Sequence, residues 1–279
     1  MKFKEYSHRH ADAIIANDEQ LKEKYNEFTN ALTSISEDEL IEDFLKKKEE
    51  HIQRRTSFKS ITPSINDLLK RKMLSISGWK AEVDIFNDDA GEIENTEWRL
   101  DFAYDDAFCI EVAFNHGEAI AWNLLKPVLA CELNHVKKAV QGQIGIYVCA
   151  TDKMKTAGNI DSASGSFEKV LRYLPPMMNQ LTVPMMIIGL EPFETFKIST
   201  NAKIIRQNHI IDESLIDKKV IVTQMDDYST YKGRVTSVDE VVIENNVERQ
   251  ITVHKSTNRS KKFTERMIRF LEIIREEEY

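Results

Sequence analysis

Two acidic residues in a predicted β-hairpin are the side chains of this sequence best placed to do chemistry together. Residues 98–114 alternate apolar and polar side chains on either side of a three-residue loop centred on Asp106, which predicts two antiparallel strands. In that register Asp101 lies directly opposite Glu111, with about 5 Å between their Cβ atoms. Two carboxylates at this distance repel each other unless a cation binds between them. Oxygen-only ligands of this kind suit Mg²⁺, with water or phosphate oxygens completing its shell.

The apolar side chains of the same strands point to the opposite face, into the core, and fix the register. They are Leu100, Phe102, Ile110, Val112 and Phe114. We expect the acid pair at a sheet edge near a cleft, an arrangement that suits metal-assisted hydrolysis of a phosphodiester. The alternative is an ordinary hairpin that carries an Asp and a Glu on its solvent face and binds no metal.

The pattern along the chain predicts a mixed sheet between helices. Helical periodicity covers 11–32 and 38–54, and the polar stretch after 151 runs into a helix near 167–173. Shorter helices are predicted over 64–74 and over 118–140, where Pro127 should kink or divide the helix. Strands are predicted at 79–86, 97–104, 108–114, 144–150 and 183–190. The resulting order, α-β-β-β-α-β-α-β, is typical of an α/β fold whose mixed sheet is sandwiched by helices.

The composition changes after about Ser199. Residues 218–255 alternate and are punctuated by turns, which predicts four or five short antiparallel strands, and a terminal helix is expected from about Lys262. We therefore expect an N-terminal helical region at 1–60, a core at 61–200 and a small β module with its terminal helix at 201–279.

Composition and charge narrow the class of protein. Charged residues make up 30% of the chain and hydrophobic residues 42%, as in ordinary globular proteins, and no apolar run is long enough for a membrane span. The first residues lack the apolar core of a signal peptide, so we expect a cytoplasmic protein. Cys109, Cys131 and Cys149 are expected to be buried thiols. Neither GxxxxGK[ST] nor GxGxxG occurs, which disfavours a P-loop NTPase or a Rossmann enzyme.

The net charge of −8 argues against a protein that coats nucleic acid indiscriminately, but local charge around a cleft still allows DNA binding. Residues 254–275 are rich in Lys and Arg. This stretch is either a solvated face or a surface that contacts phosphates.

The hairpin resembles a known family of nucleases. Its two runs, Trp98-Arg99-Leu100-Asp101-Phe102 and Ile110-Glu111-Val112-Ala113-Phe114-Asn115-His116, are similar to the Asp…Glu-Val-x-Phe pattern of the BglII/BstYI-type restriction endonucleases, a branch of the PD-(D/E)XK nucleases. Further matches follow in order: the Ser- and Gly-rich residues 161–168 resemble the family's loop leading into a helix, and 184–192 resemble its late buried strand. The resemblance spans about 61–192 and implies a restriction-endonuclease-like core.

The resemblance implies a restriction endonuclease of a restriction-modification system, acting on double-stranded DNA as a homodimer that cuts both strands of a palindromic site. Asp101 and Glu111 would ligate Mg²⁺, with the Val112 region lining the metal site. Position 113 would belong to the catalytic set. The loop 151–166 would contact DNA, and the residues assigned to that role are Asn115, His116, Lys153, Lys155, Thr156, Asn159, Ser162, Ser164 and Ser166. Short hydroxyl and amide donors suit this role. The alternative is an ordinary polar surface loop in which Ser164 or Ser166 caps the following helix.

Position 113 departs from the family, which places Lys, Gln or Glu two residues after the Glu. Ala113 can neither position a water molecule nor stabilise charge. Three explanations are open: the chain is a deliberately inactivated nuclease, the missing group comes from Lys126 or Arg99, or the protein binds DNA without cutting it. The first is favoured, because the surrounding pattern is retained.

Two other functions remain open. The first is a catalytically silent DNA-binding protein on the same fold. The second comes from residues 218–253, which faintly resemble small Sm-like or SH3-like barrels; on this hypothesis the β module binds RNA or a protein partner.

Overall fold

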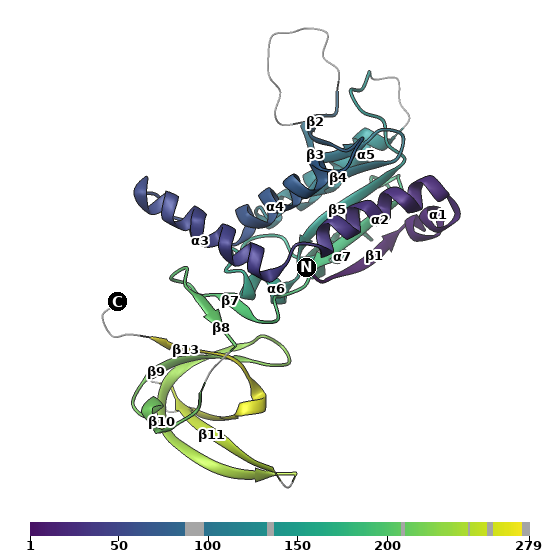
Figure 1. The fold of residues 1–279 in the computed structure, drawn as a ribbon. Helices are drawn as coiled ribbons and strands as arrows, with labels where there is room; N and C mark the ends of the chain where they lie inside the picture. The colour runs from purple at the N-terminus through teal and green to yellow at the C-terminus, as the bar shows by residue number, and fades with distance from the viewer. Residues whose placement is uncertain (87–97, 133–136, 208–209, 245, 256–258, 275–279) are drawn as a thin grey trace. The chain divides into compact units, whose positions relative to one another are not determined.

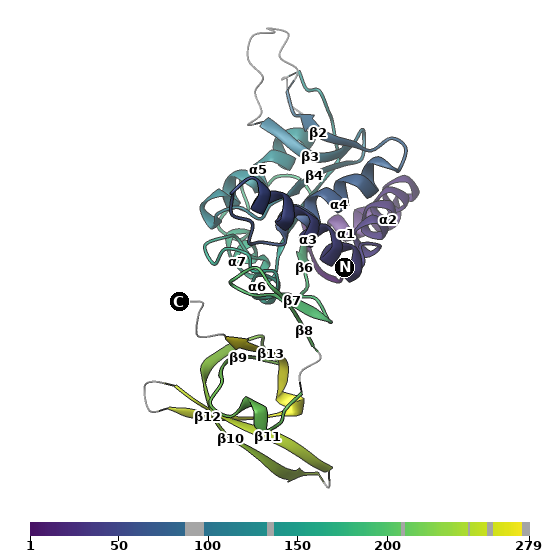
Figure 2. The same ribbon diagram turned by 60° about the vertical axis from the view of Figure 1, so that its left-hand side comes forward.

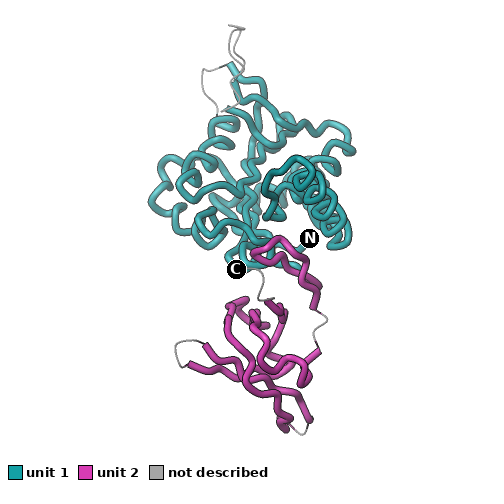
Figure 3. The backbone as a smooth tube through the Cα atoms, turned by 90° about the vertical axis from the view of Figure 1, so that its left-hand side faces the viewer, with its two compact units in different colours: residues 1–193 teal, residues 194–279 magenta. Residues whose placement is uncertain are grey.

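The computed structural model describes residues 1–86, 98–132, 137–207, 210–244, 246–255 and 259–274. It divides into two compact units, Met1–Phe193 and Glu194–Tyr279, which Figure 3 distinguishes by colour. The helices predicted for the N-terminal region share the first unit with residues 61–193 of the predicted core, and residues 194–200 of that core belong to the second unit. The polar turn expected at 87–96 lies outside the described residues.

The first unit is built on a six-stranded mixed sheet in the order β1-β6-β5-β4-β3-β2 (Figure 1). Strands β4, β5 and β6 run parallel to one another, and the remaining neighbours pair antiparallel. The strands are β1 (Phe3–His8), β2 (Lys80–Asp84), β3 (Arg99–Tyr104), β4 (Phe108–Val112), β5 (Ile144–Ala150) and β6 (Met185–Leu190). The predicted fold class, a mixed sheet flanked by helices, is confirmed.

Helices cover both faces of this sheet, and Figure 2 shows α5 and α7 on one side and α2 and α4 on the other. The helices are α1 (Ala11–Asn17), α2 (Glu19–Thr33), α3 (Glu37–Gln53), α4 (Thr62–Leu74), α5 (Ile120–Cys131), α6 (Asp152–Ala157) and α7 (Phe167–Tyr173), with a short 3₁₀ helix η2 (Gly117–Ala119) before α5. The face of β4 that carries Phe108 packs on α2, where the Phe108 ring lies 6.0 Å from that of Tyr25. The opposite face of β4 packs on α5.

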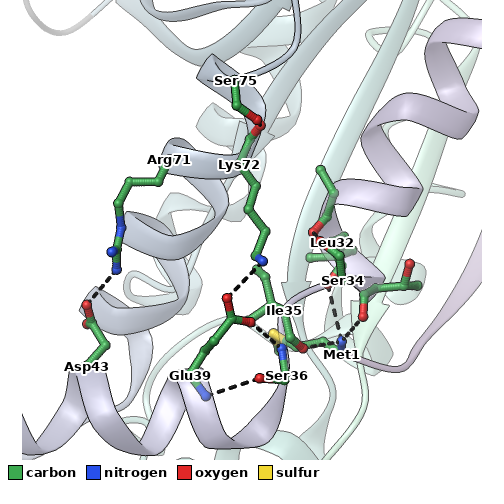
Figure 4. A network of polar contacts seen from close by, with 12 residues as sticks. Met1, Leu32, Ser34, Ile35, Ser36, Glu39, Asp43, Arg71, Lys72 and Ser75 are labelled. Carbon is green, nitrogen blue, oxygen red and sulfur yellow. Dashed lines mark hydrogen bonds and ion pairs between the residues drawn. The ribbon is translucent and has the colours of Figure 1, made fainter.

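A polar network joins α2, α3 and α4 (Figure 4). Ser36 and Glu39 form a capping box at the start of α3, and Glu39 also accepts a 3.0 Å hydrogen bond from Lys72 of α4. The Met1 amino group donates to the main-chain oxygen of Ile35 at 2.8 Å, just after α2 ends. Main-chain oxygens near a helix C-terminus favour such a cation.

Several elements of the first unit differ from prediction, among them α6, which lies in a stretch predicted as a loop. Strand β1 was not predicted, and it closes the sheet by pairing antiparallel with β6. The helix predicted over 11–32 is two helices, because the Asp18 side chain caps a new helix by accepting from the Leu21 N–H at 2.9 Å. The helix predicted over 118–140 is shorter, because α5 ends at Cys131, and Pro127 lies inside α5 without dividing it.

The second unit contains a five-stranded antiparallel sheet in the order β12-β11-β10-β9-β13. Its elements are β7 (Phe196–Ile198), β8 (Ile204–Arg206), η3 (Glu213–Leu215), β9 (Lys219–Gln224), β10 (Thr230–Ile243), β11 (Asn246–His254), β12 (Ser260–Thr264), η4 (Glu265–Met267) and β13 (Ile268–Ile274). Their apolar faces enclose a core that includes Val222, Val235 and Phe263.

The terminal helix predicted from about Lys262 is wrong. That segment forms β12 and β13, and β13 pairs with β9, where Ile268 and Phe270 bury their side chains. The local run of Glu and Arg favours a helix, but burial of these two side chains against a strand distant in the sequence decides the conformation.

Candidate active site

The β3–β4 hairpin has the register that the sequence predicted. Phe102 pairs with Ile110 and Tyr104 with Phe108, around a turn in which Asp106 has a φ of 59°. Continued by one residue, this register places Asp101 across from Glu111. The Val112 N–H donates to Asp101 Oδ2 at 2.6 Å, so the two strands hold this carboxylate in place.

The acid pair lies in the interior of the sheet, and the expected edge position is wrong, because β2 is the edge strand. The face that carries Asp101 and Glu111 is covered by α5. Glu111 is only 4% exposed, and Asp101 is half-buried. The expected apolar face is buried as well, with Phe102 and Ile110 at 4% and 0% exposed. Both faces of the hairpin are therefore enclosed.

Burial raises the pKa values of both carboxyl groups. Burial, followed by the charge of Asp101, raises the pKa of Glu111 to about 7. Burial also raises the pKa of Asp101, against the lowering effect of its hydrogen bond from Val112. Carboxyl groups with raised pKa values in an enclosed site are a frequent feature of active sites.

Lys126 of α5 reaches the acid pair. Its Nζ lies 2.8 Å from Glu111 Oε1, and the two side chains are 15% and 6% exposed. The second cation that the sequence offered, Arg99, pairs with Asp84 of the edge strand at 3.0 Å. Of the two, Lys126 is the one that this structure brings to Glu111.

Glu82 of β2 is a third acid in the same row, and it was not predicted. The pairs Ala81–Phe102 and Val83–Leu100 flank it, so it lies level with Asp101. Its φ of 54° interrupts the pairing, a conformation that residues with a Cβ rarely adopt. Its charge raises the pKa values of both Asp101 and Glu111, and its carboxylate accepts from Lys70 at 3.0 Å. The alternation of charged and apolar residues over 80–84 is the signal that could have indicated it.

The residues present fit a divalent cation. Glu111 Oε2 is buried and has no hydrogen-bond partner, while Oε1 is held by Lys126. A hard cation binds such oxygens well and removes the repulsion between the carboxylates. Within the described residues no group of three or more His, Cys, Asp or Glu side chains is close enough to form a metal site. Water and phosphate oxygens would therefore have to complete the shell around the two acids.

The loops expected to contact DNA lie at the same end of the sheet as the acid pair. Because β4, β5 and β6 are parallel, the segments that follow β4 and β5 both begin at the end of the sheet where these strands finish. There, His116 and Ser164 form an isolated antiparallel bridge, and the Gly165 N–H donates to the Asn115 oxygen at 3.0 Å. The structure thus brings the segments 113–119 and 161–166 together.

Several side chains of these loops already make bonds within the protein. The Ser164 hydroxyl is buried and donates to the Phe114 oxygen at 2.9 Å, and the buried Ser166 hydroxyl caps α7. Lys155 Nζ donates to the main-chain oxygens of Ser162 and Ser164 at 2.8 and 2.6 Å.

Two asparagines have similar internal roles. The Asn115 side-chain oxygen accepts a hydrogen bond from the Asn123 amide of α5 at 2.8 Å. The Asn159 amide donates to the main-chain oxygen of Lys59 at 3.0 Å. The side chains of this set that remain exposed, apart from Asn115, are His116, Lys153, Thr156 and Ser162.

Comparisons with known proteins identify the family of this chain. The family model "Restriction endonuclease BglII/BglIII" matches residues 3–190, which is most of the chain and nearly all of the first unit. Two solved structures are similar over 95% of this chain and 100% of their own: BglII complexed with a DNA 16-mer (18% identity, TM-score 0.48) and free BglII (15% identity, TM-score 0.40). A search of curated protein sequences found no match. In the described part of the chain, no helix is long and apolar enough to cross a membrane. The matched family model shows that this chain belongs to the BglII/BglIII restriction endonucleases, which are site-specific deoxyribonucleases.

Proposed function

We propose that this chain cuts both strands of double-stranded DNA at a specific sequence, using Mg²⁺ held by Asp101 and Glu111. The observation that carries the proposal is Glu111 Oε2, a buried oxygen without a hydrogen-bond partner that lies across the hairpin from a second carboxylate. Burying such an oxygen is costly unless a cation binds it. Bound there, Mg²⁺ would supply the Lewis acidity for attack of water on a phosphodiester.

The chain's own residues position this chemistry. The Val112 N–H orients Asp101, and α5 shields Glu111 from bulk water, which strengthens electrostatic interactions at the site. DNA contact at this end of the sheet is supported by four exposed side chains with hydrogen-bond donors: His116, Lys153, Thr156 and Ser162.

We also propose a symmetric dimer on the DNA. Each chain carries one acid pair, and cutting both strands of a palindrome requires two sites related by a two-fold axis. The molar mass in solution, measured by light scattering with and without a duplex, tests this point. Such an enzyme also requires a methyltransferase that protects the same sequence in the host DNA.

The proposed cleavage is tested on a library of random duplexes in Mg²⁺, with the cut ends sequenced. We expect the wild type to cut one sequence, and Asp101→Asn and Glu111→Gln to abolish cutting while binding DNA in Ca²⁺. Asp105→Asn, in the exposed turn of the same hairpin, serves as the matched control and should cut normally. Cleavage that persists in both Asp101→Asn and Glu111→Gln would refute the assigned site.

Ala113 favours a second candidate, a catalytically silent DNA-binding protein on the same fold. This protein would select a duplex sequence with no dependence on metal, and the wild type would never cut it. Cleavage that appears only after Ala113→Glu, Ala113→Gln or Ala113→Lys would instead identify an inactivated nuclease.

A further inference from the structure

A positively charged side chain, that of Lys126, lies in the candidate active site, although Ala113 provides no polar group there. Lys126 Nζ lies 2.8 Å from Glu111 Oε1, and Lys126 comes from the helix that follows the catalytic strand rather than from the strand itself. The Lys126 side chain is 15% exposed, so it is held at the site rather than extended into solvent.

The packing around Ala113 explains why this position is small. Ala113 is 4% exposed and belongs to the same core cluster as Ile120 and Leu124 of α5. A long side chain at 113 would have to enter the space between β4 and α5. A methyl group there lets α5 pack on β4, and this packing brings Lys126 to Glu111.

A second polar contact fixes α5 in this position. Asn123, one helical turn before Lys126, is buried and donates to Asn115 in the segment that follows β4. Residues three apart share one face of a helix. The side of α5 that carries Asn123 and Lys126 therefore faces the end of β4, where the acid pair lies.

We propose that Lys126 supplies from α5 the polar group that position 113 of β4 lacks, so that the nuclease site is complete. This inference rests on the proposed endonuclease function. In this role Lys126 holds Glu111 in position and offsets negative charge that develops at the phosphate during attack. Lys126 thus acts on the charge of the reacting phosphate as well as on Glu111, and the chain needs no side chain at 113 to cut DNA.

The test compares Lys126→Met with Lys22→Met, the same change at an exposed position of α2. Single-turnover cleavage is measured at saturating Mg²⁺, and metal binding is measured separately by the rise in melting temperature with Ca²⁺. We expect Lys126→Met to lose about 100-fold or more in cleavage, as when a charge-stabilising donor is removed from an active site. Its response to Ca²⁺ should be no weaker than that of the wild type, because a cation that competes with the metal has been removed. Lys22→Met should match the wild type in both measurements.

The conservative variant Lys126→Arg tests whether the positive charge is what matters, and we expect it to keep at least tenfold more cleavage than Lys126→Met. Full cleavage by Lys126→Met at saturating metal would overturn the inference and leave the proposed function standing. If Lys126→Arg folds and cuts no better than Lys126→Met, the role of the charge is overturned. If Lys126→Met does not fold, Lys126→Gln, which keeps a donor for Glu111 without the charge, makes the same comparison. A wild type that binds DNA and metal and never cuts would overturn both the inference and the proposed function.

Discussion

Glu111 and Asp101 face each other from two paired strands inside the sheet, and Glu111 is almost fully enclosed. The pKa of Glu111 is raised from 4.5 to about 7. Between these two pH values the folded, metal-free protein keeps a proton on Glu111, whereas the unfolded chain releases it. The stabilisation from this proton is fully present below pH 4.5 and is lost as the pH rises through 7.

Glu111→Gln should therefore stabilise the metal-free protein at pH 8. The shift corresponds to about 3 kcal/mol in the free energy of unfolding, at 1.36 kcal/mol per pKa unit. Urea unfolding in EDTA at pH 8 and at pH 4.5 measures this difference, which should nearly vanish at the lower pH. The same difference between variant and wild type at both pH values would contradict the assigned pKa.

Lys155 and Lys153 offer a matched pair of changes in one short helix. Lys155 Nζ holds two main-chain oxygens of the loop 161–166, whereas Lys153 is exposed. Lys155→Met should lower the melting temperature by a few degrees and weaken DNA binding, because the loop loses its anchor. Lys153→Met should leave the melting temperature unchanged. If Lys153 contacts a phosphate, its removal should lower the slope of log affinity against log salt by about 1. Equal effects of the two variants on melting would argue against the anchor.

Gly189 is required by the close approach of α7 to β6. A Cβ at this position would lie 2.6 Å from ring atoms of Phe167. Gly189→Ala should lower the free energy of unfolding by about 1–3 kcal/mol through overpacking. Adding Phe167→Ala should make the combined loss smaller than the sum of the two single losses. Strictly additive losses in urea unfolding would show that the ring is not what the new methyl group meets.

The second unit should unfold on its own. Its core, which includes Phe263 at 0% exposed, is drawn from residues of that unit, and the core around the acid pair is drawn from the first. Phe263→Ala should lower the temperature of one calorimetric transition by several degrees and leave a second unchanged, since a lost aromatic ring costs about 3–5 kcal/mol. A single transition that shifts as a whole would mean that the two units unfold together.

The sequence was sufficient where local pattern decides the structure. The alternation on either side of Asp106 predicted the hairpin and its register, and the apolar run at 144–150 predicted β5 with its bounds. Distant partners decided the rest. Strand β1 has few apolar residues and depends on β6, and β13 has helix-favouring charges and depends on β9.

The candidate site shows the same division. Asp101 and Glu111 follow from spacing within one hairpin, but the sequence could not distinguish Lys126 from Arg99. That choice depends on how α5 crosses β4, which is set by packing of residues such as Ala113 and Leu124. The position of Glu82 depends on an unusual backbone angle that no pattern of residue types specifies.

The pairing of β1 with β6 also has a consequence for the order of events during synthesis. Phe3 pairs with Leu190, so β1 waits for a partner made roughly 190 residues later, about 10–40 s at ordinary rates of translation. Until then the acid pair can form within its hairpin, but the open side of the sheet has no edge strand. During synthesis the hairpin with the acid pair is therefore complete before the sheet can close, and chaperones have that interval in which to bind the exposed strands.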